Sequence, residues 1–336
     1  MRPTHWIGFS AEAAGLSSHS CTLARADIRD IGMSEFPDAS AVVRWWRNGS
    51  SAVGRLRAPP WQARYGRVVG IPTPGADRVA IVTGASSGIG EAIALELAQR
   101  GHQLVLVARR ADRLHTVARG LSPPAHVLPA DLSSRADRAG LPGRIAALGL
   151  APDILVNNAG LAGRAHVAKS VPEQQLNLVE VDVAAVVDLC SRFLPGMVER
   201  GRGAVLNVSS LAGFYPTPGQ ATYGAAKAFV LSYTETLRSE LRGTGVSASA
   251  LCPGPVATGL DDVAGFGVGE RAAVLPSFMW KSAEEVARAA IDGLDADKGQ
   301  VVPGRANWVA ATFCRFAPHE RLTPLLARRA LPRKLN

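Results

Sequence analysis

Tyr223 and Lys227 are the two residues of this sequence whose types and spacing best suit chemistry. They stand four positions apart at the start of a helical pattern over residues 223–242, and such positions share one face of a helix. A free phenol has a pKa near ~10 and is a poor base at neutral pH. An ammonium about 4 Å away contributes roughly 4 kcal/mol at an effective dielectric constant of ~20, or about three pKa units. The pair therefore predicts a tyrosine that works as a general acid and base near neutral pH.

Ser210 is a third candidate for the same site. It lies thirteen residues before Tyr223, at the end of the apolar run 204–208. A serine at a strand end is ordinarily a turn residue. Beside the Tyr–Lys pair, its hydroxyl is predicted to hydrogen-bond a substrate carbonyl while the tyrosine gives its proton.

A glycine-rich turn, T-G-A-S-S-G-I-G, follows the apolar run 79–82 and precedes a helical pattern. Glycines let the backbone turn tightly and approach a pyrophosphate, and the free N–H groups at the start of the helix favour an anion. The spacing is G-x-x-x-G-x-G, and its place between a strand and a helix predicts a dinucleotide site. The residues expected to contact the cofactor are Gly84, Ser86, Ser87, Gly88, Ile89 and Gly90.

Arg109 occupies the position that distinguishes the two nicotinamide cofactors. It follows the second predicted strand, nineteen residues after Gly90. An acidic residue there binds the 2′-hydroxyl of NAD, whereas an arginine suits the 2′-phosphate of NADP. We predict NADP, with NAD still open because Asp112 is close by. The alternative is that Arg109 and Arg110 are solvated loop charges.

Apolar runs alternate with helical patterns from residue 77 onward, which predicts βαβ units and a Rossmann-like, doubly wound parallel sheet. Seven runs have the length and composition of buried strands: Val79–Val82, Leu104–Val107, His126–Leu128, Ile154–Val156, Ala204–Val208, Val246–Leu251 and Gln300–Val302. Helices are expected between them, at Gly90–Arg100, Arg135–Leu148, Gln174–Arg200, Tyr223–Arg242 and Ser282–Leu294.

The net charge of +9 over 336 residues belongs to the ends of the chain. Residues 1–75 carry +4 and residues 299–336 carry +6, whereas residues 76–298 carry −1. A nucleic-acid enzyme would place its basic patch on the folded domain, so no nucleic-acid partner is expected. The simplest interpretation is solvated basic tails.

Three regions are therefore predicted. Residues 1–75 lack a helical or strand period and hold four of the six tryptophans, so we expect a disordered extension or linker, or translated sequence upstream of the true start. Residues 76–304 form the single Rossmann domain. Residues 305–336 form a basic amphipathic tail, which packs on its own domain in the favoured interpretation and contacts a membrane surface weakly in the alternative.

The cysteines and the apolar runs indicate the cellular setting. The four cysteines are far apart and form no C-x-x-C pair, so neither a disulfide framework nor a metal site is expected. No run of 18 apolar residues occurs, and no apolar segment follows Met1 as in a secretory signal. We expect a protein of the reducing cytoplasm.

Together, these motifs make the chain resemble the short-chain dehydrogenase/reductase superfamily, in its single-domain form with a Tyr-x-x-x-Lys site. The resemblance covers residues 77–258 and is looser to about 304. It rests on Thr83–Gly90, Asp131-Leu132, Asn157-Asn158-Ala159-Gly160, Ser210, Tyr223 with Lys227, and Pro253-Gly254.

The resemblance implies roles for the matched residues. Tyr223 would be the acid and base, Lys227 would lower the pKa of a phenol and bind the nicotinamide ribose, and Ser210 would orient the substrate. Other positions would contact the cofactor. Asp131 and Leu132 would contact the adenine, and Asn158 would lie along the cofactor. Val256 and Thr258 would hold the nicotinamide carboxamide. The alternatives are ordinary ones, a helix cap for Asp131 and a polar turn for Asn157-Asn158.

Asp182 departs from the family pattern. The family usually has an asparagine at this point of the long helix, where it helps to hold a water of the proton relay, so Asp182 is a catalytic candidate. An ionised aspartate accepts hydrogen bonds but donates none. Its backbone carbonyl is unchanged, so the efficiency of the relay is in question but activity is still expected.

The segment 259–281 follows the expected nicotinamide contact and is predicted to cover the substrate. It is rich in apolar side chains, and the glycines at 265, 267 and 269 would let it move. An apolar lid of this kind indicates a small lipophilic alcohol or carbonyl compound, whereas the alternative is ordinary helix packing. The long helices 174–200 and 223–242 commonly form interfaces in this family, which implies a homodimer or homotetramer.

The sequence therefore predicts an NADP-preferring oxidoreductase that interconverts a secondary alcohol and a ketone or aldehyde. The main rival is an NADPH-binding regulatory protein without turnover, which only the departure at Asp182 favours. A membrane-surface protein whose basic tail carries the main role is a third alternative.

Overall fold

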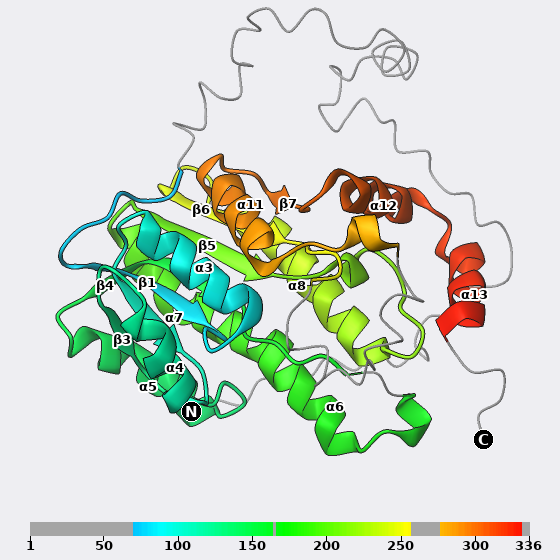
Figure 1. Cartoon of the computed structure of the whole chain (residues 1–336), viewed down its shortest axis with the longest axis horizontal. Helices are drawn as coiled ribbons and strands as arrows, with labels where there is room; N and C mark the ends of the chain where they lie inside the picture. The colour runs from blue at the N-terminus through cyan, green and yellow to red at the C-terminus, as the bar shows by residue number, and fades with distance from the viewer. Residues whose placement is uncertain (1–69, 164–165, 257–275, 331–336) are drawn as a thin grey trace, which may run out of the picture. The chain divides into compact units, whose positions relative to one another are not determined.

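Seven parallel strands form one sheet in a computed structural model that describes residues 70–163, 166–256 and 276–330 (Figure 1). The strand order is β3-β2-β1-β4-β5-β6-β7, and every neighbouring pair is parallel. This confirms the predicted Rossmann-like, doubly wound sheet. The strands are β1 (Arg78–Thr83), β2 (Leu104–Val107), β3 (Ala125–Val127), β4 (Ala151–Asn157), β5 (Gly203–Val208), β6 (Val246–Leu251) and β7 (Gln300–Val301).

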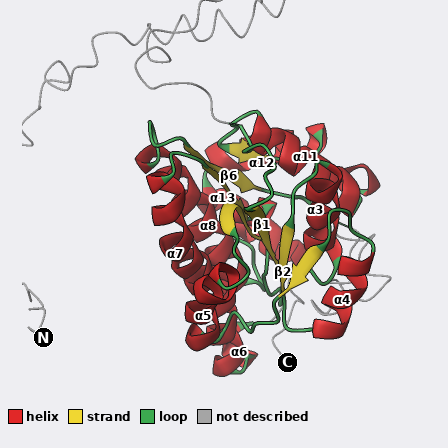
Figure 2. Ribbon diagram, turned by 90° about the vertical axis from the view of Figure 1, so that its left-hand side faces the viewer, coloured by secondary structure: helices red, strands yellow, loops and turns green. Residues whose placement is uncertain are grey.

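Helices cover both faces of this sheet, as Figure 2 shows. One face carries α3 (Gly88–Gln99), α4 (Ala111–Arg119) and α11 (Ala283–Asp295). The other carries α5 (Arg135–Ala146), α7 (Ala185–Glu199) and α8 (Ala221–Glu240). Because both faces are buried, the central strands are almost wholly apolar, as in other parallel sheets.

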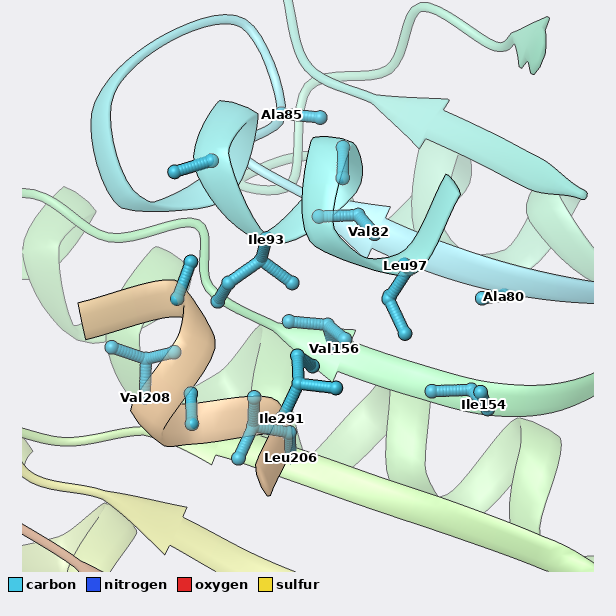
Figure 3. Packing of buried hydrophobic residues seen from close by; sticks show 14 of the residues in the cluster. Ala80, Val82, Ala85, Ile93, Leu97, Ile154, Val156, Leu206, Val208 and Ile291 are labelled. Atoms are coloured by element: carbon cyan, nitrogen blue, oxygen red, sulfur yellow. The ribbon is translucent and has the colours of Figure 1, made fainter. Parts of the chain in front are cut away.

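The core between the sheet and α3 and α11 shows how the sequence builds these layers (Figure 3). Val82, Val156 and Leu206 come from three adjacent strands and are inaccessible to solvent. Ile93 on α3 and Ile291 on α11 pack on them and are equally buried. Burial of such side chains contributes roughly 1.5–3 kcal/mol each, which holds the ends of β1, β4 and β5 in one fixed arrangement.

The strand order decides where a site can form. The chain runs outward from β1 to β3 and then returns to place β4 on the other side of β1. At such a switch point the loops after the strands diverge and leave a crevice at their carboxyl ends. The loops after β1, β4 and β5 begin with Gly84, Asn158 and Ser209, so the polar motifs of the sequence meet at this edge.

The segment expected as one helix, 174–200, is divided. It comprises α6 (Pro172–Val179), a single π-helical turn η3 (Glu180–Ala184), and α7. Such π turns often occur at functional sites, and this one carries Asp182. Helix α4 was not predicted because it is short and only Leu114 and Val117 of it are buried.

The C-terminal region is helical, with α12 (Arg305–Phe316) and α13 (His319–Ala330) after β7. No helix in the described ranges is long and apolar enough to cross a membrane. The predicted extension, residues 1–75, lies outside the described residues except for 70–75. The short 3₁₀ turns are η2 (Val167–Lys169), η4 (Leu211–Gly213) and η5 (Ser277–Met279).

Candidate active site

Helix α8 presents Tyr223 and Lys227 on one face. The two residues lie in its first two turns, and the Lys227 ammonium is 5.6 Å from the centroid of the Tyr223 ring. Lys227 is buried, whereas Tyr223 is half-buried. The helical spacing of four predicted from the sequence thus places the cation beside the phenol, where its charge acts on the ring.

Two oxygen atoms hold the Lys227 ammonium in place. Asp182 Oδ2 is 2.9 Å from Nζ, and Nζ donates a hydrogen bond of 3.2 Å to the carbonyl of Val208 at the end of β5. Burial alone lowers the pKa of Lys227, but the charge of Asp182, the phenol of Tyr223 and the hydrogen bond to Asp182 together raise it above its usual value. Lys227 therefore remains a cation despite its burial.

Ser210 follows β5 and opens the short turn η4. Its side-chain oxygen accepts a hydrogen bond of 3.2 Å from the backbone N–H of Ala212. The preceding Ser209 is buried and donates to the carbonyl of Lys227 at 2.7 Å. This bond ties the end of β5 to α8, so Ser210 and the Tyr–Lys pair are positioned by the same contact.

The glycine turn closes tightly on the loop after β4. Gly84 and Gly88 have φ angles of 66° and 61°, which only glycine adopts readily. At Gly90, a Cβ atom would stand 2.3 Å from the side-chain nitrogen of Asn158 and 2.4 Å from the carbonyl oxygen of Gly84. Asn158 in turn donates a hydrogen bond of 2.9 Å to the carbonyl of Thr83. The turn therefore packs directly on the loop after β4, with no room for a side chain at Gly90.

Comparison with known proteins gives the same assignment. A family model described as short chain dehydrogenase matches residues 78–265, more than half of the chain. The chain belongs to the short-chain dehydrogenase/reductase family. It is accordingly an NAD(P)-dependent oxidoreductase that acts on CH–OH groups.

Three proteins illustrate what this short-chain dehydrogenase is similar to. An uncharacterized oxidoreductase of Staphylococcus epidermidis is 36% identical over 191 residues, which are 57% of this chain and 83% of that protein. A very-long-chain 3-oxoacyl-CoA reductase of Anas platyrhynchos is 31% identical over 79% of this chain and 86% of its own. A short-chain dehydrogenase of Sphingobium yanoikuyae, solved in complex with NADPH, matches with a TM-score of 0.63 and 32% identity, covering 74% and 95% of the two chains.

In this short-chain dehydrogenase, Arg110 rather than Arg109 contacts the glycine turn. The Arg110 guanidinium donates to the hydroxyls of Ser86 at 3.0 Å and Ser87 at 3.1 Å. Arg109 is exposed and makes no hydrogen bond or ion pair with the residues described. The sequence analysis assigned cofactor discrimination to Arg109, which stays a prediction. The structure places the adjacent Arg110 at the glycine turn, because the direction of the backbone as it leaves β2 decides which side chain faces that turn.

The segment expected to meet the adenine is held by its own turn. Asp131 Oδ1 accepts hydrogen bonds from the backbone N–H and the hydroxyl of Ser133, at 2.9 Å and 2.8 Å. Leu132 is buried, and its carbonyl accepts a bond of 2.5 Å from Arg138. Arg138 was missed by the sequence analysis because nothing in a helical pattern marks an arginine as buried.

The expected carboxamide contacts fall on the boundary of the described chain. Val256 is buried and forms an isolated parallel bridge with Lys281. Thr258 lies outside the described residues, and so do residues 259–275 of the expected lid, which was predicted over 259–281. At the other end of this segment, Asn307 on α12 donates hydrogen bonds to the carbonyls of Met279 and Pro303, at 3.0 Å and 2.9 Å.

Proposed function

We propose that this enzyme uses NADPH to reduce a ketone or aldehyde on a small lipophilic molecule to an alcohol, and catalyses the reverse oxidation with NADP⁺. The observation that carries the proposal is the buried Lys227 ammonium beside the Tyr223 phenol. A cation in that place assists proton transfer by a phenol, and its surroundings keep it charged.

The residues present fit a dinucleotide with a 2′-phosphate. The glycine turn leaves no space for a Cβ atom at Gly84, where one would stand 2.8 Å from the Cα of Ala159, so backbone amides can approach a pyrophosphate. Arg110 adds a guanidinium at the rim of that turn, and guanidinium groups form charge-assisted bonds with phosphate. The Sphingobium relative was solved with NADPH. These points support NADP, with NAD as the alternative.

Each candidate residue has a proposed part in the reaction. The bound nicotinamide supplies or accepts the hydride. Tyr223 gives a proton to the carbonyl oxygen during reduction, and Ser210 hydrogen-bonds that oxygen. Lys227 holds a positive charge beside the phenol and binds the nicotinamide ribose. The remaining residues are assigned to cofactor binding: Gly84, Ser86, Ser87, Gly88, Ile89, Gly90, Arg109, Asp131, Leu132, Asn158, Val256 and Thr258.

The first test is a fluorescence titration of the protein with NADPH and with NADH, followed by turnover of a panel of ketones. Tyr223→Phe should bind NADPH nearly as tightly as the unchanged protein and lose turnover by roughly a thousandfold or more, because general acid–base catalysis is removed. Retained turnover would disprove the role of Tyr223. Tight NADPH binding without turnover of any carbonyl compound would favour the rival, a regulatory protein that only binds the cofactor.

The lipophilic substrate is proposed from the segment that follows the cofactor site. In its described part, Phe278 is 68% exposed on η5, and Met279 and Trp280 follow it. Exposed large apolar groups commonly line binding surfaces, and the Anas relative is described as acting on a very-long-chain acyl compound. A ketone series of increasing chain length should show kcat/KM rising with length; a flat series would contradict the proposal.

A weak membrane-surface contact is proposed for α12. Trp308, Val309, Phe313 and Phe316 are 58–81% exposed on this helix, and Arg305 and Arg315 are exposed with them. Aromatic and basic residues on one exposed helix favour the interface of an anionic bilayer. Co-sedimentation with phosphatidylglycerol vesicles should be lost in Trp308→Ser/Phe313→Ser and absent with phosphatidylcholine. Equal sedimentation of both proteins would contradict the contact.

A homodimer or homotetramer in the cytoplasm completes the proposal. On α6, Leu176 is 65% exposed and Val179 is 38% exposed, and Val171 just before the helix is 50% exposed, so this face offers apolar surface to a second copy. The cytoplasmic setting is proposed from the sequence, whose four cysteines are far apart and form no C-x-x-C pair. Light scattering should report two or four chains, and Leu176→Glu should shift the assembly toward the monomer.

A further inference from the structure

Asp182 joins two parts of the site through its two carboxylate oxygens. Oδ1 accepts a hydrogen bond of 2.6 Å from the backbone N–H of Leu161, in the loop after β4. Oδ2 is 2.9 Å from the Lys227 ammonium on α8. The carboxylate is fully buried, so both of these contacts are made away from water.

Both groups that Asp182 contacts, the Leu161 N–H and the Lys227 ammonium, are hydrogen-bond donors. This explains why an aspartate suits the position better than an asparagine. A carboxylate has two acceptor oxygens, whereas an amide has one oxygen and one NH₂ group that only donates. In either orientation, an asparagine would direct its NH₂ at Leu161 N–H or at Lys227, and a buried donor would lose its partner. Gly160 packs on the pair so closely that a Cβ atom there would be 3.1 Å from Oδ2 and 3.2 Å from Nζ.

The π-helical turn is held from both sides. Asp182 binds Leu161 and Lys227 on the side of α8, and Glu180 Oε2 is 3.2 Å from the buried Arg138 guanidinium on α5. Displacement of the turn would lengthen one of these pairs, so the contacts on the two sides oppose it.

We propose that Asp182 is a positioning residue that neutralises Lys227, keeps the Tyr223 phenol protonated to higher pH, and so favours carbonyl reduction over alcohol oxidation. This inference rests on the proposed function, since reduction is the direction in which Tyr223 gives up its proton. The Lys227 ammonium lies 5.6 Å from the centroid of the ring and only 2.9 Å from Asp182 Oδ2. The negative charge of Asp182 therefore stands close behind the positive charge that faces the phenol and opposes its effect on the ring.

Among the residues that the structure describes, the elements packed on α8 bring few other charged groups to the Tyr223 phenol. Tyr215 follows η4, and its pKa is raised by burial, then by the thiol of Cys314 on α12, and then by Tyr223. The strands β5 and β6 and the turn η4, all packed on α8, contain no titratable residue. On α6 Glu173 is exposed, and on η3 Glu180 is bound to α5. Asp182 is therefore the acid with the strongest influence on the pair among the residues described.

The test is the pH titration of the ring carbons of the tyrosines by NMR in the free protein, labelled with ¹³C at Cζ. The chain has four tyrosines, and Tyr223→Phe assigns the resonance. Asp182→Asn should move the titration midpoint of Tyr223 down by about one pH unit or more. Glu180→Gln, which removes a charge from the same turn but not from the pair, should leave it unchanged. An unchanged midpoint in Asp182→Asn, or an equal shift in both variants, would overturn the proposal.

Kinetics in both directions provide an independent measurement. In Asp182→Asn, the alkaline limb of reduction and the acid limb of oxidation should both move to lower pH by the same amount as the NMR midpoint. If this variant does not fold, Gly160→Ala keeps both charges but separates them and should move the midpoint the same way by less. The titration needs no turnover, so an enzyme without the proposed activity would still return a result on Asp182.

Discussion

Replacing Arg138 should reveal how much one buried cation stabilises the cofactor side of this enzyme. Its side chain is 2% exposed, and it makes three contacts: Leu132 O at 2.5 Å, Asp188 Oδ2 at 2.9 Å and Glu180 Oε2 at 3.2 Å. The contacts join α5, α7, the π turn and the Asp131-Leu132 segment. Arg138→Met keeps most of the volume of the side chain and removes all three.

The expected loss in the free energy of unfolding is about 4 kcal/mol. Removing one partner of a buried pair costs roughly 3–5 kcal/mol. The partners here are not fully buried: Asp188 is 21% exposed and keeps Arg192 at 2.7 Å, and Glu180 is 43% exposed. Hydration of both acids puts the electrostatic loss near the lower end of that range, and the bare Leu132 carbonyl adds about 1 kcal/mol.

Urea unfolding followed by circular dichroism measures this difference, with the slope m compared between proteins. The matched control is Arg192→Met, which removes a partly exposed cation from the same acid and should cost less than about 1 kcal/mol. A loss below about 1 kcal/mol for Arg138→Met, or equal losses in the two variants, would refute the reasoning that the buried guanidinium holds these elements together.

Three further outcomes follow from the structure. Arg110→Ala should weaken NADPH binding about tenfold or more and NADH binding little, since a charge-assisted bond contributes roughly 1.5–3 kcal/mol; equal losses for both cofactors would contradict a contact with the 2′-phosphate. Gly90→Ala should lower stability by about 1–3 kcal/mol because the new Cβ atom would meet backbone atoms. Gly140→Ala, where a Cβ atom would have nothing within 4 Å, should be neutral or stabilising. Thermal melting measures both variants. Burial, with the charges of Arg100 and Arg202, lowers the pKa of His102 in the folded state. As the pH falls, His102 therefore binds a proton in the unfolded state before it does so in the folded state. Stability should fall as pH drops below about 6.5, and His102→Gln should remove this part of the pH dependence of Tm.

Much of the fold and site could be predicted from local sequence patterns. Buried strands such as 104–107 are short apolar runs, and the spacing of Tyr223 and Lys227 is itself a helical contact. What sequence could not supply are contacts between distant segments. The pairing of Asp182 with Leu161 N–H depends on how the loop after β4 meets the π-helical turn η3, and no local pattern encodes it. Likewise, the burial of Arg138 depends on acids 42 and 50 residues away.

The bridge between Val256 and Lys281 has a consequence for how this enzyme can diversify. Val256 and Lys281 pair although 25 positions of sequence separate them, and Asn307 on α12 binds the carbonyl of Met279, two residues before Lys281. The two ends of the intervening sequence are thus held independently of its length. The entropy of closing a loop grows only with the logarithm of its length. We therefore expect insertions and deletions within residues 257–275 to change the free energy of unfolding little, and the family can vary this part of the sequence at small cost in stability.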